Sequence, residues 1–369
     1  PLIIRPSYVL GGRAMEIVYE EKNLEEYFEY SKSIWTSRHV PENNPILLDK
    51  FLINAKELDV DLVRDKEGNV YIGGVMEHIE EAGIHSGDSS CSIPPYSLSD
   101  DIINEVERQS ITIANELKIL GVMNIQFAIQ DNNIYVLEVN PRASRTIPFV
   151  AKSTGVQIAK LATDIIMGKT LNSYKNLNNY KNLKLYSVKE PVFPFKKFQN
   201  VDVLRGPEMK STGEVMGIDE NFFTAFYKGQ TAAGVNLPLK GNVFLSVKDK
   251  DKKELIPIAK KLIKLGFNLL GTIGTTTFLE KNNIQIKNIK KISEGSPHVV
   301  DLLESGEISL VINTTEGKTS TGDSYIMRRN TLLSNTPYYT TLKGADVAVN
   351  SIEVIKNANL KVRSLQTIH

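Results

Sequence analysis

Cysteine is almost absent from this sequence, because Cys91 is the single example among 369 residues. One cysteine excludes an internal disulfide and a cysteine-rich metal cluster, and it is typical of a reducing compartment. We interpret Cys91 as a small buried thiol rather than a nucleophile. Long apolar runs and an apolar leader are also missing, so we expect a soluble, cytoplasmic protein without membrane contact. A mitochondrial location stays open as the alternative.

An excess of charge of one sign is missing as well. The 44 lysine and arginine residues nearly balance the 43 aspartate and glutamate residues. No summed field would hold a nucleic acid or an anionic membrane, so any phosphate site must be local. With 41% hydrophobic residues, the chain is long enough for two or three globular domains. The apolar start Pro1–Arg5 has no initiator methionine, so we expect a piece of a longer protein.

The first part of the chain, residues 1–237, has the pattern of an α+β domain. Short strands joined by turns run from Leu2 to Val139, and apolar spacing predicts helices over Leu24–Thr36, Ser99–Leu120 and Val156–Met167. The polar stretch Asn172–Leu183 is predicted to be a surface loop. Residues 188–217 still carry apolar side chains, so we expect them to pack back on this domain. We place the boundary near Pro238–Gly241.

Residues 238–369 show a different order, in which strands and helices alternate. This alternation predicts an α/β doubly wound parallel sheet, and ligands of such sheets lie at the carboxyl ends of the strands. The predicted strands are Val243–Val247, Phe267–Ile273, Ile286–Ile292, Ser309–Asn313 and Tyr338–Leu342. The predicted helices are Lys252–Leu265, ended by Gly266, and Val299–Glu304, Ser324–Ser334 and Ala345–Ile355.

A glycine-bearing loop, RPSYVLGGR, lies between two predicted strands near the start of the chain. Gly11 and Gly12 would let backbone amides approach phosphate oxygens, and Arg5 and Arg13 would add charge-assisted hydrogen bonds. The spacing is not that of a Walker loop. A plain turn between strands explains the same residues, and both interpretations stay open.

The sharpest signal is a hairpin formed by MNIQFAI and IYVLEVNPR around the turn Asp131-Asn132-Asn133. A three-residue loop pairs residue 130 with 134, which places Gln126 opposite Glu138, and alternation puts Asn140 on the same face. One carboxylate and two amide oxygens suit magnesium. A glutamate inside an apolar run is costly unless paired or metal-bound, so we favour a metal site over a polar strand end.

Acidic and aliphatic residues alternate just before this hairpin, in KELDVD. One strand face would be acidic. Lys50 and Leu52 could flank an adenine, and Glu57 could accept hydrogen bonds from ribose hydroxyls. A solvated sheet face explains the alternation about as well.

In order along the chain, these segments resemble the ATP-grasp fold, and specifically the second synthetase half of the carbamoyl-phosphate synthase large subunit. The matching stretches are RPSYVLGGRAMEIVY, GGVMEHIEEAGIHSGDSSCSIP, NIQFAI, EVNPRASRTIPFVAKSTGV and GPEMKSTGEVMGI. The resemblance covers essentially the whole chain. It implies a truncated ATP-grasp domain over 1–237 and a methylglyoxal-synthase-like regulatory domain over 238–369.

The resemblance also implies roles for individual residues. The positions that match the family's nucleotide contacts are Arg5, Lys50, Leu52, Glu57, Gly83, Ile84, His85 and Ser86, together with Gln126 and Glu138. Gln126, Glu138 and Asn140 match its ligands for Mg²⁺ or Mn²⁺, and Arg142 and Arg145 would lie near the transferred phosphoryl group of ATP. The match at Lys50 is weaker, because this position is not fixed as lysine in the family.

The implied reaction is phosphorylation of carbamate by ATP, within carbamoyl phosphate synthesis for pyrimidine and arginine biosynthesis. The implied partners are the rest of the large subunit and a glutaminase small subunit, and free ammonia is the alternative nitrogen source. The tail would bind an effector such as UMP, IMP, ornithine or N-acetylglutamate. The positions that match its effector site are Ser246, Lys252, Thr272, Gly274, Thr275, Lys291, Asn313 and Thr315.

Two alternatives to a carbamate-phosphorylating enzyme remain. The chain could be a non-catalytic fragment that only binds an effector and docks to partners, because Pro1 begins too late to include a whole adenine-covering lobe. Another ATP-grasp ligase, of purine or biotin metabolism, would share the metal hairpin but not the regulatory tail. In that tail the lysines of residues 248–253 also fit a charge-rich turn.

Overall fold

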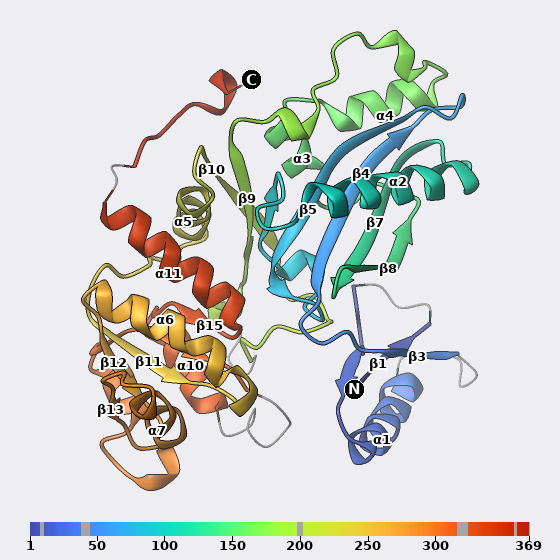
Figure 1. The fold of residues 1–369 in the computed structure, drawn as a ribbon. Coiled ribbons are helices and arrows are strands. Elements are labelled where there is room, and N and C mark those ends of the chain that lie inside the picture. Colours follow the sequence, from blue (N-terminus) through green and yellow to red (C-terminus); the bar gives the residue numbers. More distant parts are fainter. Residues whose placement is uncertain (8–10, 38–44, 198–201, 316–323, 358–359, 369) are drawn as a thin grey trace.

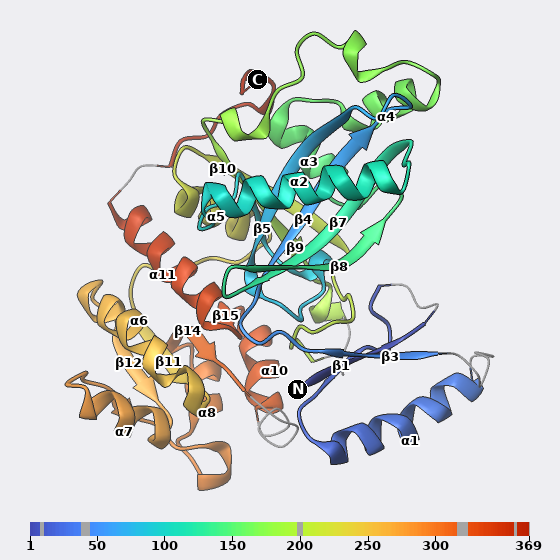
Figure 2. The same cartoon turned by 45° about the vertical axis from the view of Figure 1, so that its right-hand side comes forward.

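Three β-sheets organise the protein in a computed structural model, which describes residues 1–7, 11–37, 45–197, 202–315, 324–357 and 360–368 (Figure 1). The sheets follow one another along the chain and contain three, seven and five strands. The two larger sheets lie side by side, and the small N-terminal sheet stands apart from the helices of both (Figures 1 and 2). Among the helices of the described ranges, none combines the length and apolar composition of a membrane-spanning segment.

The N-terminal lobe is a three-stranded antiparallel sheet with one helix. Its elements are β1 (Leu2–Pro6), β2 (Glu16–Val18), α1 (Glu21–Ser37) and β3 (Ile46–Lys50), and the strand order is β2-β1-β3. Ile4, Val18 and Tyr27 form its small core. The predicted glycine loop therefore joins two paired strands, as expected, although its residues 8–10 lie outside the described ranges.

The seven-stranded sheet is antiparallel throughout, which agrees with the predicted α+β arrangement. Its order is β10 (Gly213–Asp219), β9 (Tyr186–Val192), β6 (Cys91–Ile93), β5 (Val70–Glu81), β4 (Lys56–Arg64), β7 (Gly121–Gln130) and β8 (Asn133–Asn140). Its helices are α2 (Asp100–Glu116), α3 (Ile147–Thr154), α4 (Ile158–Ile166) and α5 (Phe222–Ala232). The thiol of Cys91 is buried in this sheet, and burial raises its pKa.

The hairpin of β7 and β8 has the predicted pair Gln126–Glu138, but it reaches that register by another route. Its turn contains two residues rather than three, because Asp131 and Asn132 both have positive φ values, of 50° and 62°. Such values are those of a tight hairpin turn. Gln130 therefore pairs with Asn133, and a bulge at Leu137 restores the predicted register from Glu138 onward.

The C-terminal sheet is parallel and covered on both faces, as predicted. Its order is β13 (Lys287–Asn288), β12 (Asn268–Gly271), β11 (Asn242–Ser246), β14 (Ile308–Asn313) and β15 (Tyr338–Tyr339). Along β11, Val243 and Leu245 pack with α6 (Lys252–Lys264) and α11 (Leu342–Lys356), whereas Phe244 packs with α8 (Val299–Glu304) and α10 (Tyr325–Leu333). This alternation is that of a strand buried between two helical layers.

Helix α6 shows why the sequence predicted these elements. Its buried residues Leu255, Ile258, Ala259 and Leu262 recur at helical spacing, and Gly266 follows its end with a φ of 84°. Other predicted bounds were wrong. Two outer strands are shorter than expected, at β13 and β15, and α11 begins at Leu342 instead of Ala345. Helices α3, α5 and α7 (Ile273–Lys281) were not predicted as elements of their own.

One apolar core joins residues from both sides of the predicted boundary. Ile79, Val188 and Phe226 of the first part belong to the same buried cluster as Leu262 and Val349 of the second. Helices α5 and α11 also pack against each other. The two parts are therefore continuous through their hydrophobic interior.

Candidate active site

Two rows of polar side chains cross β4, β7 and β8 on one face of the seven-stranded sheet. In the first row Asp59 pairs with Gln126, and Gln126 pairs with Glu138. In the second row Asp61 pairs with Asn124, and Asn124 pairs with Asn140. The three predicted metal ligands, Gln126, Glu138 and Asn140, therefore share one face at the sheet edge, because side chains on a strand alternate between faces.

The two amides of this group donate their N–H groups to neighbouring protein atoms. Nε2 of Gln126 donates to Oγ of Ser86 over 2.9 Å, and Nδ2 of Asn140 donates to Oδ1 of Asn124 over 3.5 Å. Their carbonyl oxygens are then the atoms left for a cation beside the Glu138 carboxylate. This oxygen-only donor set fits a magnesium or manganese ion.

Glu138 itself is exposed, which corrects one step of the sequence argument. A glutamate in an apolar run was expected to be buried and therefore to need a partner or a metal. Instead β8 is the last strand of its sheet, and Tyr135, Val136 and Leu137 are 40%, 47% and 38% exposed. Burial therefore gives no reason to infer a metal at Glu138. The reason is its pairing with Gln126 on the face that also holds Asn140.

The acidic strand β4 is buried rather than solvated, so the solvated-face interpretation was wrong. Asp59 and Asp61 are 3% and 0% exposed. Asp59 accepts a hydrogen bond from Nδ2 of Asn124 over 3.2 Å and lies 2.8 Å from Nε2 of His78. Burial raises the pKa of Asp61 to about 6 although Thr146 and Asn124 donate to it. These residues form a buried polar layer behind Gln126.

The loop after β5 approaches this layer through Gly83. Its φ is 101°, and a side chain there would meet the ring of Phe51 at 2.8 Å, so only glycine fits. The amide of Gly83 donates to Oε1 of Glu57 over 3.0 Å. Burial raises the pKa of Glu57 to about 6, although His78 and this hydrogen bond oppose the shift. The loop residue Ile84 is buried.

His85 is held in one orientation in the same loop. The amide of Gly87 donates to its Nδ1 over 3.0 Å, and burial lowers the pKa of His85. The imidazole is therefore neutral near pH 7 and carries its proton on Nε2, which is available as a donor. Ser86 completes the loop and receives the Gln126 hydrogen bond.

The predicted nucleotide residues of the N-terminal lobe lie on its two longer strands. Arg5 on β1 forms an ion pair of 3.2 Å with Asp49 on the neighbouring strand β3. Lys50 ends β3 and is exposed, whereas Leu52 is half-buried in the connection to β4. Phe51 from the same connection touches Gly83, so this lobe meets the loop of residues 83–88, here called the nucleotide loop after its predicted ligand.

Arg142 and Arg145 follow β8 on exposed backbone, but they differ in their surroundings. Nη1 of Arg142 donates to the carbonyl of Ala143 over 3.0 Å. The guanidinium of Arg145 contacts the sulfur of Met209 and lies close to His85. The structure therefore brings Arg145, rather than Arg142, to the nucleotide loop.

The segment that carries Met209, here called the strap (residues 202–211), was not among the predicted site residues. Its Gly206 carbonyl accepts the amide of His85 over 2.8 Å, and its Met209 amide donates to the Gly11 carbonyl over 3.0 Å. Asp88 accepts the amides of Lys210 and Ser211, both over 2.8 Å. The predicted packing of residues 188–217 on the first part is thus confirmed for the strap, whereas residues 198–201 lie outside the described ranges. The strap touches both the glycine loop and the nucleotide loop.

The predicted effector residues gather at the carboxyl ends of β11, β12 and β14. Oγ of Ser246 lies 3.1 Å from Oγ1 of Thr272, which directly precedes α7. Nδ2 of Asn313 donates to the Ser246 carbonyl over 2.9 Å, and Oγ1 of Thr275 accepts the amide of Val247 over 3.2 Å. Four of the eight predicted residues are therefore linked into one cluster.

The other four flank this cluster. Nζ of Lys252 lies beside Gly274 and forms an ion pair of 2.7 Å with Asp249. Lys291 is exposed beyond β13, and Thr315 follows β14 by two residues. The structure brings Lys252 to the start of α7, and Lys291 and Thr315 follow the carboxyl ends of β13 and β14 in the same parallel sheet.

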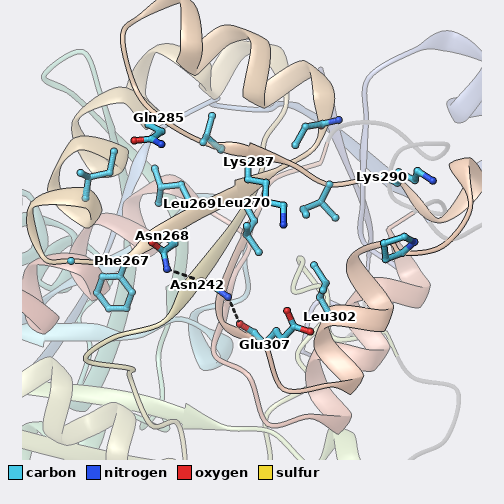
Figure 3. A pocket seen from close by; sticks show the side chains of 16 residues that line it. Asn242, Phe267, Asn268, Leu269, Leu270, Gln285, Lys287, Lys290, Leu302 and Glu307 are labelled. Carbon is cyan, nitrogen blue, oxygen red and sulfur yellow. Dashed lines mark hydrogen bonds between the residues drawn. The ribbon is translucent and has the colours of Figure 1, made fainter.

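A cavity of about 750 Å³ lies at the opposite, amino end of the same sheet, against the strand β13 (Figure 3). Asn242 bridges its floor, because it accepts a hydrogen bond from Asn268 over 3.1 Å and donates one to the Glu307 carbonyl over 2.8 Å. Lys287 and Lys290 lie on its rim. None of the predicted effector residues lines this cavity.

Two family models match the chain in the order that the fold suggests. Residues 1–174 match the carbamoyl-phosphate synthase L chain, ATP binding domain, and residues 254–340 match the MGS-like domain. The first part of the chain therefore has the sequence of an ATP-binding domain of this kind, and the C-terminal part contains an MGS-like domain.

Similar proteins narrow this class. The chain is 50% identical to the carbamoyl phosphate synthase large chain, C-terminal section, of Aquifex aeolicus, with 100% of this chain and 71% of that protein covered. It is 50% identical to the carbamoyl phosphate synthase large chain of Myxococcus xanthus, over 99% of this chain and 33% of that protein. The chain belongs to the carbamoyl phosphate synthase large-chain family, and it spans about a third of the length of the Myxococcus relative.

Solved structures that match part of the chain include biotin carboxylases. That of Campylobacter jejuni is 19% identical, with a TM-score of 0.45 over 52% of this chain and 42% of that one. The biotin carboxylase domain of a Hydrogenobacter thermophilus 2-oxoglutarate carboxylase is also 19% identical, with a TM-score of 0.46 over 59% of this chain and 52% of that one.

Proposed function

We propose that this protein transfers the γ-phosphoryl group of ATP to carbamate, which yields carbamoyl phosphate and ADP. The observation that carries the proposal is the pairing of Gln126 with Glu138 on the polar face that also holds Asn140. Membership in the carbamoyl phosphate synthase large-chain family supports it. The protein would act in carbamoyl phosphate synthesis from bicarbonate, ATP and glutamine or ammonia, for pyrimidines and arginine.

We assign divalent metal binding to the oxygens of Gln126, Glu138 and Asn140. The amide hydrogen bonds to Ser86 and Asn124 support this assignment, because they leave carbonyl oxygens for the metal. A bound Mg²⁺ or Mn²⁺ would neutralise charge on the nucleotide phosphates. The buried Asp59 pairs with Gln126 in register on the neighbouring strand, so a carboxylate lies behind that amide.

The nucleotide would be held between the N-terminal lobe and the loop of residues 83–86. Neutral His85 can donate its Nε2 proton to a phosphate or ribose oxygen, and Glu57 can accept from a ribose hydroxyl. Arg5, Lys50 and Leu52 lie on the lobe that would cover the adenine. These positions require the lobe to stay close to Gly83, which the contact of Phe51 supports.

Charge that develops on the transferred phosphoryl group needs fixed cations. Arg145 is the first candidate, because it lies beside His85 and is held by Met209. Arg142 lies two residues after Asn140, donates its amide to the Asn140 carbonyl over 2.8 Å and is exposed, so it could also reach the phosphoryl group. No protein nucleophile is required for such a transfer.

The test is ATP formation from ADP and carbamoyl phosphate, the reverse partial reaction, in the full-length protein and its Glu138→Gln variant. Loss of the carboxylate should lower the rate by orders of magnitude, roughly a hundredfold or more. Because Glu138 is exposed on an edge strand, the variant should remain folded. An unchanged rate would refute the metal assignment.

Asp131→Asn is the matched control for this test. It makes the same change of a carboxylate to an amide, in the same hairpin, but at the turn. Asparagine tolerates the positive φ of 50° at this position. We expect the control to keep the wild-type rate, so that a loss in Glu138→Gln reports the site and not the hairpin.

The MGS-like part would bind a small effector at the cluster of Ser246, Thr272, Thr275 and Asn313. Hydroxyl groups beside the start of α7 suit a phosphate, which favours a nucleotide such as UMP or IMP over ornithine or N-acetylglutamate. The partners would be the rest of the large chain and a glutaminase small subunit, in the cytoplasm. Titration with UMP and IMP should give saturable binding that Thr272→Val weakens about tenfold.

A further inference from the structure

The strap joins the nucleotide loop to the C-terminal part of the protein. At one end, the Asp202 carboxylate accepts two hydrogen bonds from the guanidinium of Arg328 on α10, one of them 2.7 Å long. The Arg328 side chain is 1% exposed, so the pair lies inside the protein on that side. In both views the strap, drawn in yellow-green, lies between the seven-stranded sheet and the N-terminal lobe (Figures 1 and 2).

Hydrogen bonds within the strap, and others from Arg205 to Glu80 and Asp88, hold the strap in place between its two ends. Nζ of Lys210 donates to the carbonyls of Asp202 and Leu204, over 3.3 and 2.7 Å. Nη1 of Arg205 donates to Oε1 of Glu80 over 2.6 Å and to the Asp88 carbonyl over 3.1 Å. A displacement of Asp202 would therefore move the following residues with it instead of being absorbed by a loose loop.

The other end of the strap supports the residues expected to touch ATP. Gly206 binds the backbone of His85, and Met209 binds Gly11 and contacts Arg145. The fit is close, because a side chain at Gly12 would come within 1.9 Å of the Pro207 carbonyl oxygen. A shift of the strap would change the positions of these groups together.

From Arg328, contacts continue to the effector cluster. Helix α10, which carries Arg328, packs against β15, and the hydroxyl of Tyr338 on β15 donates to Oδ1 of Asn313 over 2.9 Å. Asn313 in turn donates to the carbonyl of Ser246 over 2.9 Å. Contacts therefore run from Ser246 through Asn313, Tyr338 and helix α10 to Asp202.

We propose that the strap, through the Asp202–Arg328 ion pair, transmits changes at the effector cluster to the nucleotide loop. The proposal rests on the function proposed above, since it takes ATP as the ligand of that loop. The ion pair suits this role because a buried guanidinium is costly without its carboxylate, so the contact is either made or lost as a unit. The coupled unit is the strap with α10.

The experiment compares Asp202→Asn, Tyr338→Phe and their double variant in the full-length protein. Amide hydrogen exchange of residues 83–88 and the dissociation constant of ATP are the two measurements. Both single variants should speed exchange in the nucleotide loop, roughly tenfold for Asp202→Asn, and should weaken ATP binding about fivefold. The double variant should equal Asp202→Asn, because both changes act on the same series of contacts.

Glu220→Gln is the matched control, since Glu220 forms an exposed ion pair of 2.7 Å with Arg363 that also joins the two parts of the chain. It should leave both measurements unchanged. The proposal would be overturned if Asp202→Asn left the amide exchange of residues 83–88 unchanged. It would also be overturned if the effects of the two single variants added up in the double variant. The exchange measurement needs no nucleotide, so changed exchange without ATP binding would reject the proposed function and still support the coupling.

Discussion

Nε2 of His78 lies 2.8 Å from Oδ2 of Asp59, and both side chains are closed to solvent. Burial favours the neutral imidazole, but the hydrogen bond and negative charge of Asp59 raise the pKa of His78 above 6.5. Burial also disfavours the aspartate, yet His78 lowers the pKa of Asp59 below 3.8. The sheet thus contains an ion pair behind the predicted metal ligands.

This pair predicts how stability changes with pH. His78 contributes its full stabilisation below pH 6.5, and the contribution is lost as the pH rises through its raised pKa. Asp59 contributes above pH 3.8 and loses its contribution as the pH falls through its lowered pKa. The free energy of unfolding should therefore decline from pH 6.5 upward, and His78→Gln should remove that decline. Urea titrations of the wild type and of His78→Gln across this range measure how the free energy of unfolding changes with pH. Equal slopes against pH in the two proteins would contradict the prediction.

Unlike the pair of His78 and Asp59, the buried carboxylate of Glu57 should lower the stability of the protein at pH 7. Its raised pKa, about 6 instead of 4.5, means that stability is lost as the pH rises between these values. Glu57→Gln keeps an acceptor for the Gly83 amide and should stabilise the protein at pH 7 by about 2 kcal/mol. The same variant should bind ATP roughly tenfold more weakly, because the charged acceptor is lost. Urea unfolding and calorimetric titration with ATP measure the two effects, and lower stability at pH 7 would count against this account.

Gly11 and Gly12 provide a matched pair of variants at the strap. Both have positive φ values, of 65° and 68°, so alanine strains either by about 1 kcal/mol. Only Gly12→Ala would also collide with the Pro207 carbonyl, since Gly11 has open space out to 4.0 Å. Gly12→Ala should therefore weaken ATP binding clearly more than Gly11→Ala does. Similar dissociation constants would mean that the contact with Pro207 is not needed at the site.

The shared hydrophobic core predicts that the two parts of the chain unfold together. Phe226 is 1% exposed and belongs to the cluster that continues into the parallel sheet. Phe226→Ala should cost about 3–5 kcal/mol and shift a single calorimetric transition to lower temperature. Leu333→Ala, at a residue 58% exposed, is the control and should change little. Two separate transitions, with only one of them shifted, would show that the parts unfold independently.

Local patterns predicted elements wherever the physical cause was local. The apolar spacing of α6 and the alternation along β11 gave both the elements and their buried faces. The pairing of Gln126 with Glu138 was also predicted, but only because the wrong turn length and the bulge that was not predicted cancel each other in the register. The turn is one residue shorter than expected because Asp131 and Asn132 both adopt positive φ, and the bulge at Leu137 returns the residue.

Features that depend on distant contacts could not be predicted. The strap has no periodicity, and its position follows from partners such as Asp88 and Arg328, more than a hundred residues away. The segment Asn172–Leu183 was predicted to be a surface loop, yet Tyr180 within it is buried and donates to Glu107 over 2.6 Å. Exposure of Glu138 likewise depends on β8 being the last strand of its sheet, which the run of residues around it does not reveal.

Because β8 is the last strand of its sheet, the predicted metal ligands on it lie away from the residues that stabilise the sheet. Glu138 and Asn140 extend from a strand that has a neighbour on one side only, so substitutions there disturb few packing contacts. The buried ion pair of His78 and Asp59, two strands and more further in, has no such freedom. Substitutions at these outer positions would therefore alter the proposed metal binding with little change in the stability of the sheet.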